Sequence, residues 1–553
     1  MSLRKKKWVI KNTDKNKTIF QKLLSNRDLK EDFEIKDFHD PFLFSDMKKS
    51  VERIDKAIAN SERIIIFGDY DVDGISGTAL LMHALTKVKA NVSCRLPNRL
   101  EDGYGLSEKF IDEFIEKNIG LIITVDCGIS CKNVISKAKN AGIDTIITDH
   151  HTIPDEFPSD AFAILHPKLE NSNYPFEDLT GAGVALKLAH ALAITNLPKD
   201  QYESFLESLL DLASLGTVAD LGSLKDENHL IVKRGLKRLE NTKWAGLKKL
   251  KELANLKEGE AMDTNNIGFH IAPRINAAGR IGDPYIALKL LLQQEYGKQT
   301  QSLGQSLENL NKERQKMTET SLDEAKALFV NPEDEYILIA HSPDWHVGIL
   351  GLIAGKLSEK YGRPAIAMQD FGDMLVASAR SPQHFNVVEA IKDSSEHLMS
   401  FGGHAQAAGF NLKKESLKAF EEKIKKFAKS KLKNKDLTSI LEIDCEIKNS
   451  EINFDILNEI QKLAPFGVAN QRPSFLLRNV EPLFVQQVGK GGDHLKFNLN
   501  INGSNFNVIA FRMGSHIDDI RRHRKLDIVF NLENNTWNNR SSLQLQALDF
   551  KLN

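Results

Sequence analysis

Residues 63–74 read RIIIFGDYDVDG, a short apolar strand followed at once by a turn that carries three carboxylates. The next residues, ISGTALLMHALTKV (75–88), have helical periodicity, so the carboxylates stand on a strand-to-helix turn. Further apolar runs lie at 92–97, 120–126, 144–149 and 161–167, with helix-like stretches at 107–118 and 129–141. Strands that alternate with helices predict an α/β fold with a mainly parallel sheet.

The three carboxylates of the turn are Asp69, Asp71 and Asp73. Placed this close together they repel one another unless a cation neutralises them, and a hard divalent metal is the cation that such oxygen ligands suit. The plain alternative is a solvated acidic turn or a calcium loop. A calcium loop of the EF-hand type ends in Glu at its twelfth position, and that position, counted from Asp69, holds Leu80.

Two other strand ends carry polar side chains: Asp126 after the run at 120–125, and Asp149-His150-His151 after the run at 144–148. The carboxyl ends of parallel strands face one crevice, so these groups can meet the acidic turn there. Asp220, in TVADLGSL, is a further candidate. Taken singly, a strand-end Asp is more often a helix cap. Together they exceed what one cation needs, which favours two Mn²⁺ or Mg²⁺ ions, the arrangement used to split phosphate esters.

The remaining sequence divides into further domains. We predict an N-terminal arm or subdomain at 1–58, a catalytic α/β domain at 59–225, a helical region with a long connecting helix at 226–330, a smaller α/β domain at 331–436 and a β-rich domain at 437–553. The connecting helix is expected at 298–329, and six short strands are expected in the last domain, which indicates a small barrel or sandwich.

The chain has 553 residues and a formal net charge of -1, which would argue against a nucleic-acid enzyme if charge were evenly spread. It is not evenly spread, because residues 413–435 hold ten lysines and three glutamates, a local charge of +7. Four cysteines in so long a chain fit a reducing compartment. Without a signal peptide or an 18-residue apolar run, the sequence predicts a cytoplasmic protein with no membrane contact.

The motifs DYDVDG (69–74), VDCG (125–128), DHH (149–151) and TVADLGSL (217–224) resemble those of the DHH phosphoesterase superfamily. Downstream, INAAGRIGDP (275–284), NKERQ (311–315), WHVGILGLIAGKL (345–357), SARS (378–381), FGGHAQAAGF (401–410) and LAPFGVANQRP (463–473) resemble the RecJ family of single-strand-specific exonucleases. The resemblance runs in order over about residues 60–553. It departs mildly at Ala469 and Gln471, where Gly and Pro are common, which leaves the fine geometry of that loop open.

The resemblance implies a DHH-type parallel-sheet domain, a long helix, a smaller α/β DHH-associated domain and a C-terminal OB-fold β-barrel. It also implies roles for individual residues. The metal ligands would be Asp69, Asp71, Asp73, Asp126, His150 and Asp220, and the catalytic residues Asp126, His150 and His151. Substrate-binding residues would be Asn276, Arg280, His346, Ser378, Arg380, Gly402, Gly403 and His404. Without the motif context, each Arg would be read as part of a surface ion pair and the Gly-Gly-His segment as a tight turn.

The function implied is a 5′→3′ exonuclease that degrades single-stranded DNA to 5′-mononucleotides with two Mn²⁺ or Mg²⁺ ions, in DNA recombination and repair. The resemblance also suggests a helicase and a single-strand-binding protein as partners, and we expect a monomer. Two rival hypotheses are a DHH phosphodiesterase acting on small molecules or oligoribonucleotides, and a non-catalytic single-strand-binding protein. In the β-rich domain, candidate DNA contacts are Phe484, His494, Lys496, Phe511, Arg512 and Trp537.

Overall fold

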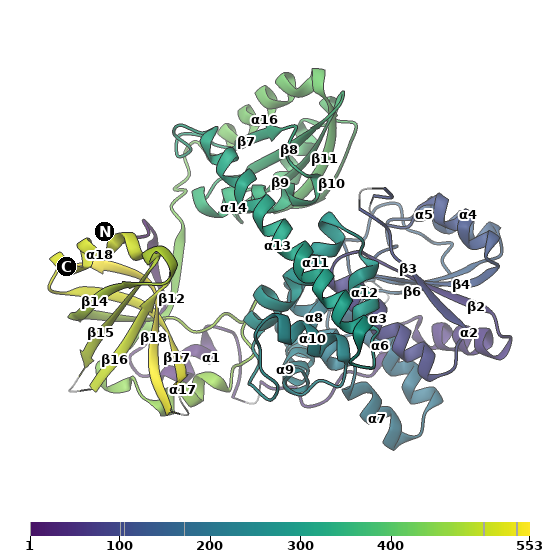
Figure 1. Cartoon of the computed structure of the whole chain (residues 1–553), viewed down its shortest axis with the longest axis horizontal. Coiled ribbons are helices and arrows are strands. Elements are labelled where there is room, and N and C mark those ends of the chain that lie inside the picture. Colours follow the sequence, from purple (N-terminus) through teal and green to yellow (C-terminus); the bar gives the residue numbers. More distant parts are fainter. Residues whose placement is uncertain are drawn as a thin grey trace. The chain divides into compact units, whose positions relative to one another are not determined.

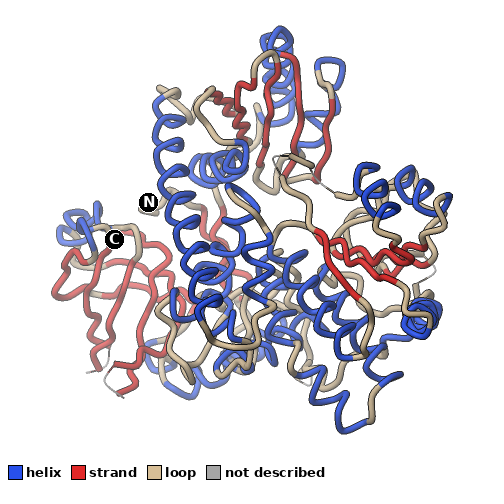
Figure 2. The backbone as a smooth tube through the Cα atoms, turned by 45° about the vertical axis from the view of Figure 1, so that its right-hand side comes forward, coloured by secondary structure: helices blue, strands red, loops and turns tan. Residues whose placement is uncertain are grey.

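The computed structural model describes residues 2–31, 33–99, 101–103, 105–170, 172–501, 504–537 and 540–553. The chain forms two compact units, Ile35–Lys435 and a discontinuous unit of Met1–Glu34 with Asp436–Asn553. Figures 1 and 2 show that helices dominate the first unit and strands the second.

A five-stranded sheet with the order β3-β2-β4-β5-β6 lies in the first unit, and all its strand pairs are parallel. Alternate side chains of β2 point to opposite faces: Ile64 and Ile66 pack with one cluster, Ile65 and Phe67 with another. Helices α2, α3 and α6 cover the first face, and α4 and α5 the second. The expected parallel α/β architecture is therefore confirmed. The elements are β2 (Arg63–Gly68), β3 (Val92–Arg95), β4 (Ile119–Val125), β5 (Asp144–Thr148), β6 (Ala163–Leu165), α2 (Met47–Ala59), α3 (Val72–Lys87), α4 (Glu108–Glu116), α5 (Lys132–Asn140) and α6 (Gly181–Asn196).

The strand order reverses at β2, because the next strand in sequence, β3, lies on one side of it and β4 on the other. The loops that leave β2 and β4 therefore diverge and open a crevice at the carboxyl edge of the sheet. Those two loops carry the acidic turn and Asp126, so the topology alone places the predicted ligands together.

A helical region follows the sheet. It begins with α6, α7 (Lys199–Glu207) and α8 (Leu210–Ala219), which are separate helices because Pro198 and the turn near Leu209 interrupt the helical backbone. Then come α9 (Asp226–Glu240), α10 (Ala245–Leu253), α11 (Ala272–Ile281), α12 (Tyr285–Leu291) and α13 (Lys298–Ala327). The 30-residue α13 is the predicted connecting helix and packs on α11 and on α14 of the next domain (Figure 1). No helix among the described residues is long and apolar enough to cross a membrane.

The second sheet of this unit has the order β10-β11-β9-β8-β7, with only β7 and β8 parallel. The motifs SARS and FGGHAQAAGF fall on β9, β10 and β11. The elements are β7 (Leu338–Ser342), α14 (Leu350–Tyr361), β8 (Ala365–Phe371), β9 (Met374–Arg380), α15 (Val387–Asp393), β10 (Ser400–His404), β11 (Ala407–Lys413) and α16 (Leu417–Leu432).

The discontinuous unit is an eight-stranded sheet with the order β1-β12-β13-β17-β18-β16-β15-β14, and the six predicted strands are β13 to β18. The segment predicted as an arm at 1–58 is divided. Its first part pairs β1 parallel to β12 and packs α1 into the core of this unit, whereas α2 packs on the parallel sheet of the other unit. The elements are β1 (Lys7–Asn12), α1 (Ile19–Ser25), β12 (Ile440–Glu446), α17 (Phe454–Gln461), β13 (Phe475–Val480), β14 (Pro482–Val488), β15 (His494–Ile501), β16 (Ser504–Ala510), α18 (Ile517–Arg522), β17 (Leu526–Trp537) and β18 (Arg540–Leu552).

Candidate metal centre and phosphate site

The acidic turn after β2 is held by backbone N–H groups. Asp71 is the N-cap of α3, and its Oδ1 accepts from the N–H groups of Asp73 (2.9 Å) and Gly74 (3.1 Å). Asp73 is buried, and its two oxygens accept from the N–H groups of Gly181 (2.7 Å) and Ala182 (2.9 Å) at the start of α6. The positive end of the α6 dipole thus fixes one carboxylate of the cluster in place.

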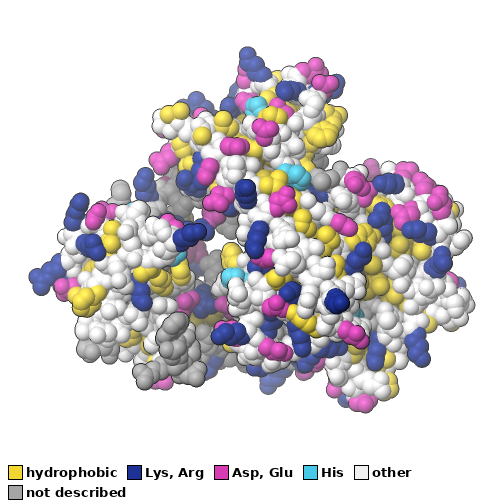
Figure 3. All heavy atoms as spheres, in the orientation of Figure 1, with side chains coloured by type: hydrophobic (Ala, Val, Ile, Leu, Met, Phe, Trp, Pro, Cys, Tyr) yellow, Lys and Arg dark blue, Asp and Glu magenta, His cyan; other side chains and the backbone are white. Residues whose placement is uncertain are grey.

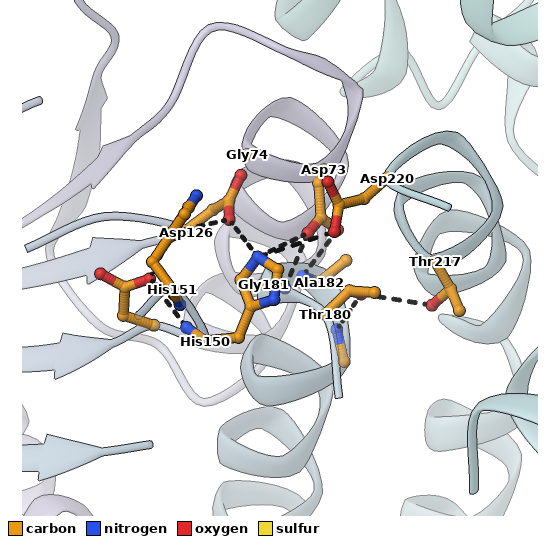
Figure 4. A network of polar contacts seen from close by, with 12 residues as sticks. Asp73, Gly74, Asp126, His150, His151, Thr180, Gly181, Ala182, Thr217 and Asp220 are labelled. Carbon is orange, nitrogen blue, oxygen red and sulfur yellow. Dashed lines mark hydrogen bonds and ion pairs between the residues drawn. The ribbon is translucent and has the colours of Figure 1, made fainter. Parts of the chain in front are cut away.

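Asp126 and His150 complete the centre (Figure 4). Asp126 follows β4 with a left-handed backbone (φ 61°), and its side chain is buried. Nε2 of His150 lies 3.1 Å from Asp126 Oδ1, 3.7 Å from Asp220 Oδ2 and 3.9 Å from Asp73 Oδ2. One imidazole nitrogen therefore faces three carboxylates that come from β4, α8 and the β2–α3 turn.

These side chains fit divalent cations. Their ligand atoms form three overlapping groups, each within 4.8 Å: Asp126, His150 and His151; Asp73, His150 and Asp220; and Asp69, Asp71 and Asp126. Asp69 Oδ1, Asp126 Oδ1 and His150 Nε2 are buried and make no hydrogen bond among the described residues; the last two face each other at 3.1 Å without hydrogen-bond geometry. Buried polar atoms are normally paired, so these orphaned lone pairs suit a cation as their partner. Carboxylate oxygens with imidazole nitrogen and no thiolate favour Mn²⁺ or Mg²⁺.

The raised pKa values of the clustered carboxylates also indicate a cation site. Burial, together with repulsion from Asp71, raises the pKa of Asp69 to about 8 and that of Asp73 to about 7. Burial, with repulsion from Asp73, raises the pKa of Asp220 to about 8. The pKa of Asp126 is raised well above its usual range by burial and by its acidic neighbours. Desolvated carboxylates that repel one another gain stability when a cation replaces their protons.

Asp149, the first residue of the DHH motif, orients the loop rather than joining the cluster. Its Oδ2 accepts from the N–H of Ile129 (3.0 Å), and its Oδ1 lies 2.7 Å from His151 Nδ1. Burial opposes its ionisation, but the hydrogen bond from His151 outweighs this and lowers the Asp149 pKa to about 2. Burial opposes protonation of His151, but the Asp149 carboxylate outweighs it and raises the His151 pKa to about 9. Asp149 was expected only to reach the crevice together with His150 and His151, and its first place in the DHH motif was the signal for this orienting role.

The predicted phosphate-binding residues lie on α11, the turn before α14, and β9. Arg280 donates to the Gly348 carbonyl (3.2 Å), and Asn276 lies one turn before it on α11. His346 caps the turn at Val347–Ile349 by accepting from the Gly348 N–H (3.0 Å). Arg380 donates to Ser378 Oγ (3.1 Å), and a Cβ on Gly351 would lie 2.8 Å from Arg380 Nη2. A side chain at position 351 would therefore displace the Arg380 guanidinium from the place it occupies.

The glycine-histidine segment lies on β10, the exposed edge of the second sheet. Gly403 has φ 144°, and a Cβ there would lie 2.4 Å from the Ala407 carbonyl, so only glycine fits. Gly402 shares a cross-strand row with Ser378, and His404 shares one with Arg380. His404 Nδ1 lies 3.2 Å from Thr152 Oγ1, which joins this edge to the DHH motif.

Two arginines that the sequence analysis left without a role stand near this set. Burial lowers the pKa of Arg280 to about 10, and the charges of Arg99, Arg314 and Arg380 contribute to that shift, so the four guanidinium groups are electrostatic neighbours. Arg99 stacks over the Tyr70 ring at 4.2 Å and donates to the Gly279 carbonyl. Arg314 has a buried Nε without a hydrogen-bond partner among the described residues. Like charges gathered at one place indicate an anion site. Arg314 stands inside the quoted motif NKERQ, which was the available signal.

In the eight-stranded unit, Phe484 is 81% exposed with φ 55°, a costly conformation for an aromatic residue. Phe511 and His494 make an edge-to-face pair at 5.2 Å, and the Arg512 N–H donates to His494 Nδ1. Lys496 is exposed on β15. The side chain of Trp537 lies outside the described residues. These positions suit stacking on bases, but no contact to DNA is assigned.

The lysine-rich segment 413–435 is partly neutralised where it lies. Four of its lysines pair with carboxylates: Lys413 with Glu415, Lys414 with Asp370, Lys423 with Glu396 and Lys425 with Glu421. On the face seen in Figure 3, Lys and Arg side chains are interspersed with Asp and Glu. The charge of +7 is therefore not read as a DNA-binding surface.

Known proteins resemble the chain over nearly its whole length. The sequence models of the DHH family N-terminal domain, the DHHA1 domain and the RecJ OB domain match residues 63–217, 334–430 and 443–549. The single-stranded-DNA-specific exonuclease RecJ of Escherichia coli (strain K12) is 31% identical over 523 residues, 91% of this chain and 89% of that protein. RecJ of Bacillus subtilis (strain 168) is 37% identical over 516 residues, 93% of this chain but only 64% of that protein.

Solved structures of RecJ proteins share the fold of this chain. RecJ from Thermus thermophilus in complex with Mn²⁺ superposes with a TM-score of 0.80 and 28% identity, covering 96% of this chain and 76% of that one. The expected order of DHH domain, long helix, DHH-associated domain and OB-fold is thereby confirmed. With the E. coli protein matched over most of both chains, the chain belongs to the RecJ family of DHH phosphoesterases.

Proposed function

We propose that this protein is a metal-dependent 5′→3′ exonuclease that degrades single-stranded DNA to 5′-mononucleotides. The observation that carries the proposal is the cluster around Asp126 and His150, whose orphaned buried atoms suit divalent cations and which lies in the same unit as four neighbouring arginines. RecJ relatives named as single-stranded-DNA-specific exonucleases supply the substrate class, and the RecJ OB domain match supports a strand-binding module. The polarity and the mononucleotide product rest on the family resemblance.

Asp69, Asp71, Asp73, Asp126, His150 and Asp220 would hold the cations, two being expected from three overlapping ligand groups. When bound, such ions supply Lewis acidity: they lower the pKa of water and offset charge on phosphate oxygens. Relatives crystallised with Mn²⁺ and with Mg²⁺ support either metal.

The protein side chains orient the strand. Arg280 and Arg380 present planar guanidinium groups that can grip phosphate oxygens in pairs. His151, kept protonated by Asp149 in the metal-free protein, can donate to a phosphate oxygen. Gly402, with open space where a Cβ would stand, leaves the β10 backbone open to close approach by the sugar-phosphate chain, and Gly403 lets the strand adopt the backbone conformation that presents it.

Digestion of 5′-labelled and 3′-labelled single strands with Mn²⁺ or Mg²⁺ tests the proposal. We expect the 5′ label to be released first as a mononucleotide, and a duplex of the same sequence to resist. Release that begins at the 3′ label would refute the polarity, and equal rates on the duplex would refute the strand specificity.

Neither rival is favoured. A phosphodiesterase for dinucleotides needs no OB domain, yet this chain has one at 443–549. A non-catalytic binding protein would not need the full set of carboxylates and histidines that stands around Asp126. If a dinucleotide were cleaved as efficiently as a long strand by the full chain, the first rival would return.

We further propose a cytoplasmic location, a helicase and a single-strand-binding protein as partners, and a monomeric state. Support for the location is chemical: Cys94, Cys127, Cys131 and Cys445 are all free thiols, as expected in a reducing compartment. Binding of the purified chain to purified single-strand-binding protein, with and without DNA, would test one of the partners. Light scattering would test the monomeric state.

A further inference from the structure

The segment that follows β6 makes hydrogen bonds to the main chain of the two histidines of the DHH motif. We call residues 166–168 (His-Pro-Lys) the HPK segment. His166 is fully buried, and its Nε2 lies 2.8 Å from the main-chain carbonyl oxygen of His151. Lys168 takes the neighbouring carbonyl: its Nζ donates to the main-chain oxygen of His150 at 3.0 Å. Successive peptide groups of the motif thus each receive one hydrogen bond from the HPK segment.

The chemistry of the partners fixes the tautomer of His166. The backbone N–H of Lys168 points at Nδ1 of His166 at 3.1 Å, and a backbone N–H can only donate. Nδ1 is therefore the acceptor, and the single proton of the neutral ring stands on Nε2, which donates to the His151 carbonyl. Both ring nitrogens are used, so the ring has one orientation that satisfies it.

These contacts bear on the metal cluster because a peptide plane carries its side chain with it. Nε2 of His150 must reach Asp126, 3.1 Å away, and the ring of His151 is placed by Asp149. The Lys168 ammonium, which contacts the main chain of His150, also acts electrostatically on Asp220 and His404. Groups that orient metal-binding side chains in this way commonly change metal affinity or activity by about 10- to 100-fold when removed.

We propose that His166 and Lys168 are positioning residues of the metal centre, which hold the main-chain carbonyls of His151 and His150 so that both imidazoles face the carboxylates. The inference rests on the proposed function for its activity readout, but not for its metal-binding readout.

Four variants of the full chain test it: H166A, H166Q, K168M and the control K139M. Lys139 is an exposed lysine of the same domain that pairs with Asp160 at 2.7 Å, away from the cluster. Binding of Mn²⁺ is measured by calorimetry, kcat and KM on labelled single-stranded DNA, and folding by thermal unfolding. We expect H166A and K168M to lose about 10- to 100-fold in Mn²⁺ affinity or kcat, with KM for DNA changed less than about twofold. K139M should match the wild type.

H166Q separates positioning from packing. Its amide Nε2 can occupy the place of the imidazole Nε2 and donate to the His151 carbonyl, so most of the loss should be restored. Two results would overturn the proposal. In the first, H166Q is as impaired as H166A. In the second, H166A and K168M both stay within twofold of K139M in Mn²⁺ affinity and kcat. A raised KM with unchanged Mn²⁺ affinity in K168M would make Lys168 a DNA contact and overturn its positioning role.

Failure of a variant to fold and failure of the proposed function can each be distinguished from failure of the positioning hypothesis. Because His166 is buried, H166A can fail to fold, and K168M, which removes an exposed group, then decides the matter alone. If the wild type binds Mn²⁺ but does not degrade DNA, the proposed function fails while the metal titrations still test the positioning residues.

Discussion

Replacing Gly181 by alanine should disable the metal centre without disturbing α6, the helix in which Gly181 lies. Gly181 is the first residue of α6, and a Cβ built there lies 2.5 Å from Asp126 Cβ and 2.7 Å from its Cγ and Oδ1. Ordinary carbon contacts begin near about 3.5 Å, so the Asp126 side chain must move by about 1 Å. The N–H that Gly181 donates to Asp73 is kept in alanine, so the perturbation is steric and falls on Asp126.

The magnitude follows from that displacement. A catalytic group misplaced by about 1 Å can cost about 100-fold in rate, which corresponds to about 2.7 kcal/mol in activation free energy. Alanine in a helix otherwise gains about 0.4–1 kcal/mol over glycine, so the melting temperature should change little. Initial rates on a 5′-labelled single strand, with Mn²⁺ affinity from calorimetry and a melting curve, give the three quantities needed.

Gly183 provides the matched control, two residues further along the same helix. A Cβ there lies 3.1 Å from Leu179 Cδ2, which must give by only a few tenths of an ångström, and it meets no metal-cluster residue. G183A should therefore keep wild-type activity. If G181A retained kcat/KM within threefold of G183A, the steric argument, and with it the importance of the Asp126 position, would be refuted.

Asp126→Asn removes the charge shared by two of the ligand groups and should lower kcat by at least about 100-fold. Added Mn²⁺ should not restore the rate, and wild-type rates at saturating metal would contradict this prediction. Arg380→Lys keeps the charge but loses the planar fork, so KM for DNA should rise about tenfold with a smaller change in kcat, as steady-state kinetics would show. Burial and repulsion raise the pKa of Asp69 to about 8, above its value in the unfolded chain. The metal-free protein should therefore lose stability as pH rises from about 4 through about 8. Melting curves with and without EDTA would measure this loss, and Mn²⁺ should abolish it. Lys187→Met leaves the buried carboxylate of Glu227 without its cation (2.7 Å in the wild type) and should cost about 3–5 kcal/mol in unfolding free energy, measured by urea denaturation.

The parallel sheet, and the gathering of the candidate metal ligands at its edge, could be predicted because both depend on short-range signals. The apolar run 63–67 and the helical periodicity after it place Asp71 at a helix N-terminus, and the strand ends bring Asp126 and His150 to the same edge. The six C-terminal strands were likewise readable from alternating apolar residues.

Other features depend on contacts between distant residues, which no local pattern reports. The need for glycine at 181 exists only because α6 starts against Asp126, and the role of His166 arises from the return of β6 beside the DHH motif. The pairing of β1 with β12 joins residues at opposite ends of the sequence, so the charged N-terminal segment resembled a free arm.

That pairing has a consequence for synthesis of the protein. Lys7 lies opposite Ile440, so strand β1 leaves the ribosome about 430 residues before its partner exists. At about 5–20 residues per second, the wait is roughly 20–90 s, during which the catalytic unit can fold first. Ile19, Leu23 and Leu24 of α1 have no core to join in that interval, because the residues they pack against are made later. A fragment made of the catalytic unit alone should therefore begin near residue 35, where the division between the units falls, rather than at the first residue.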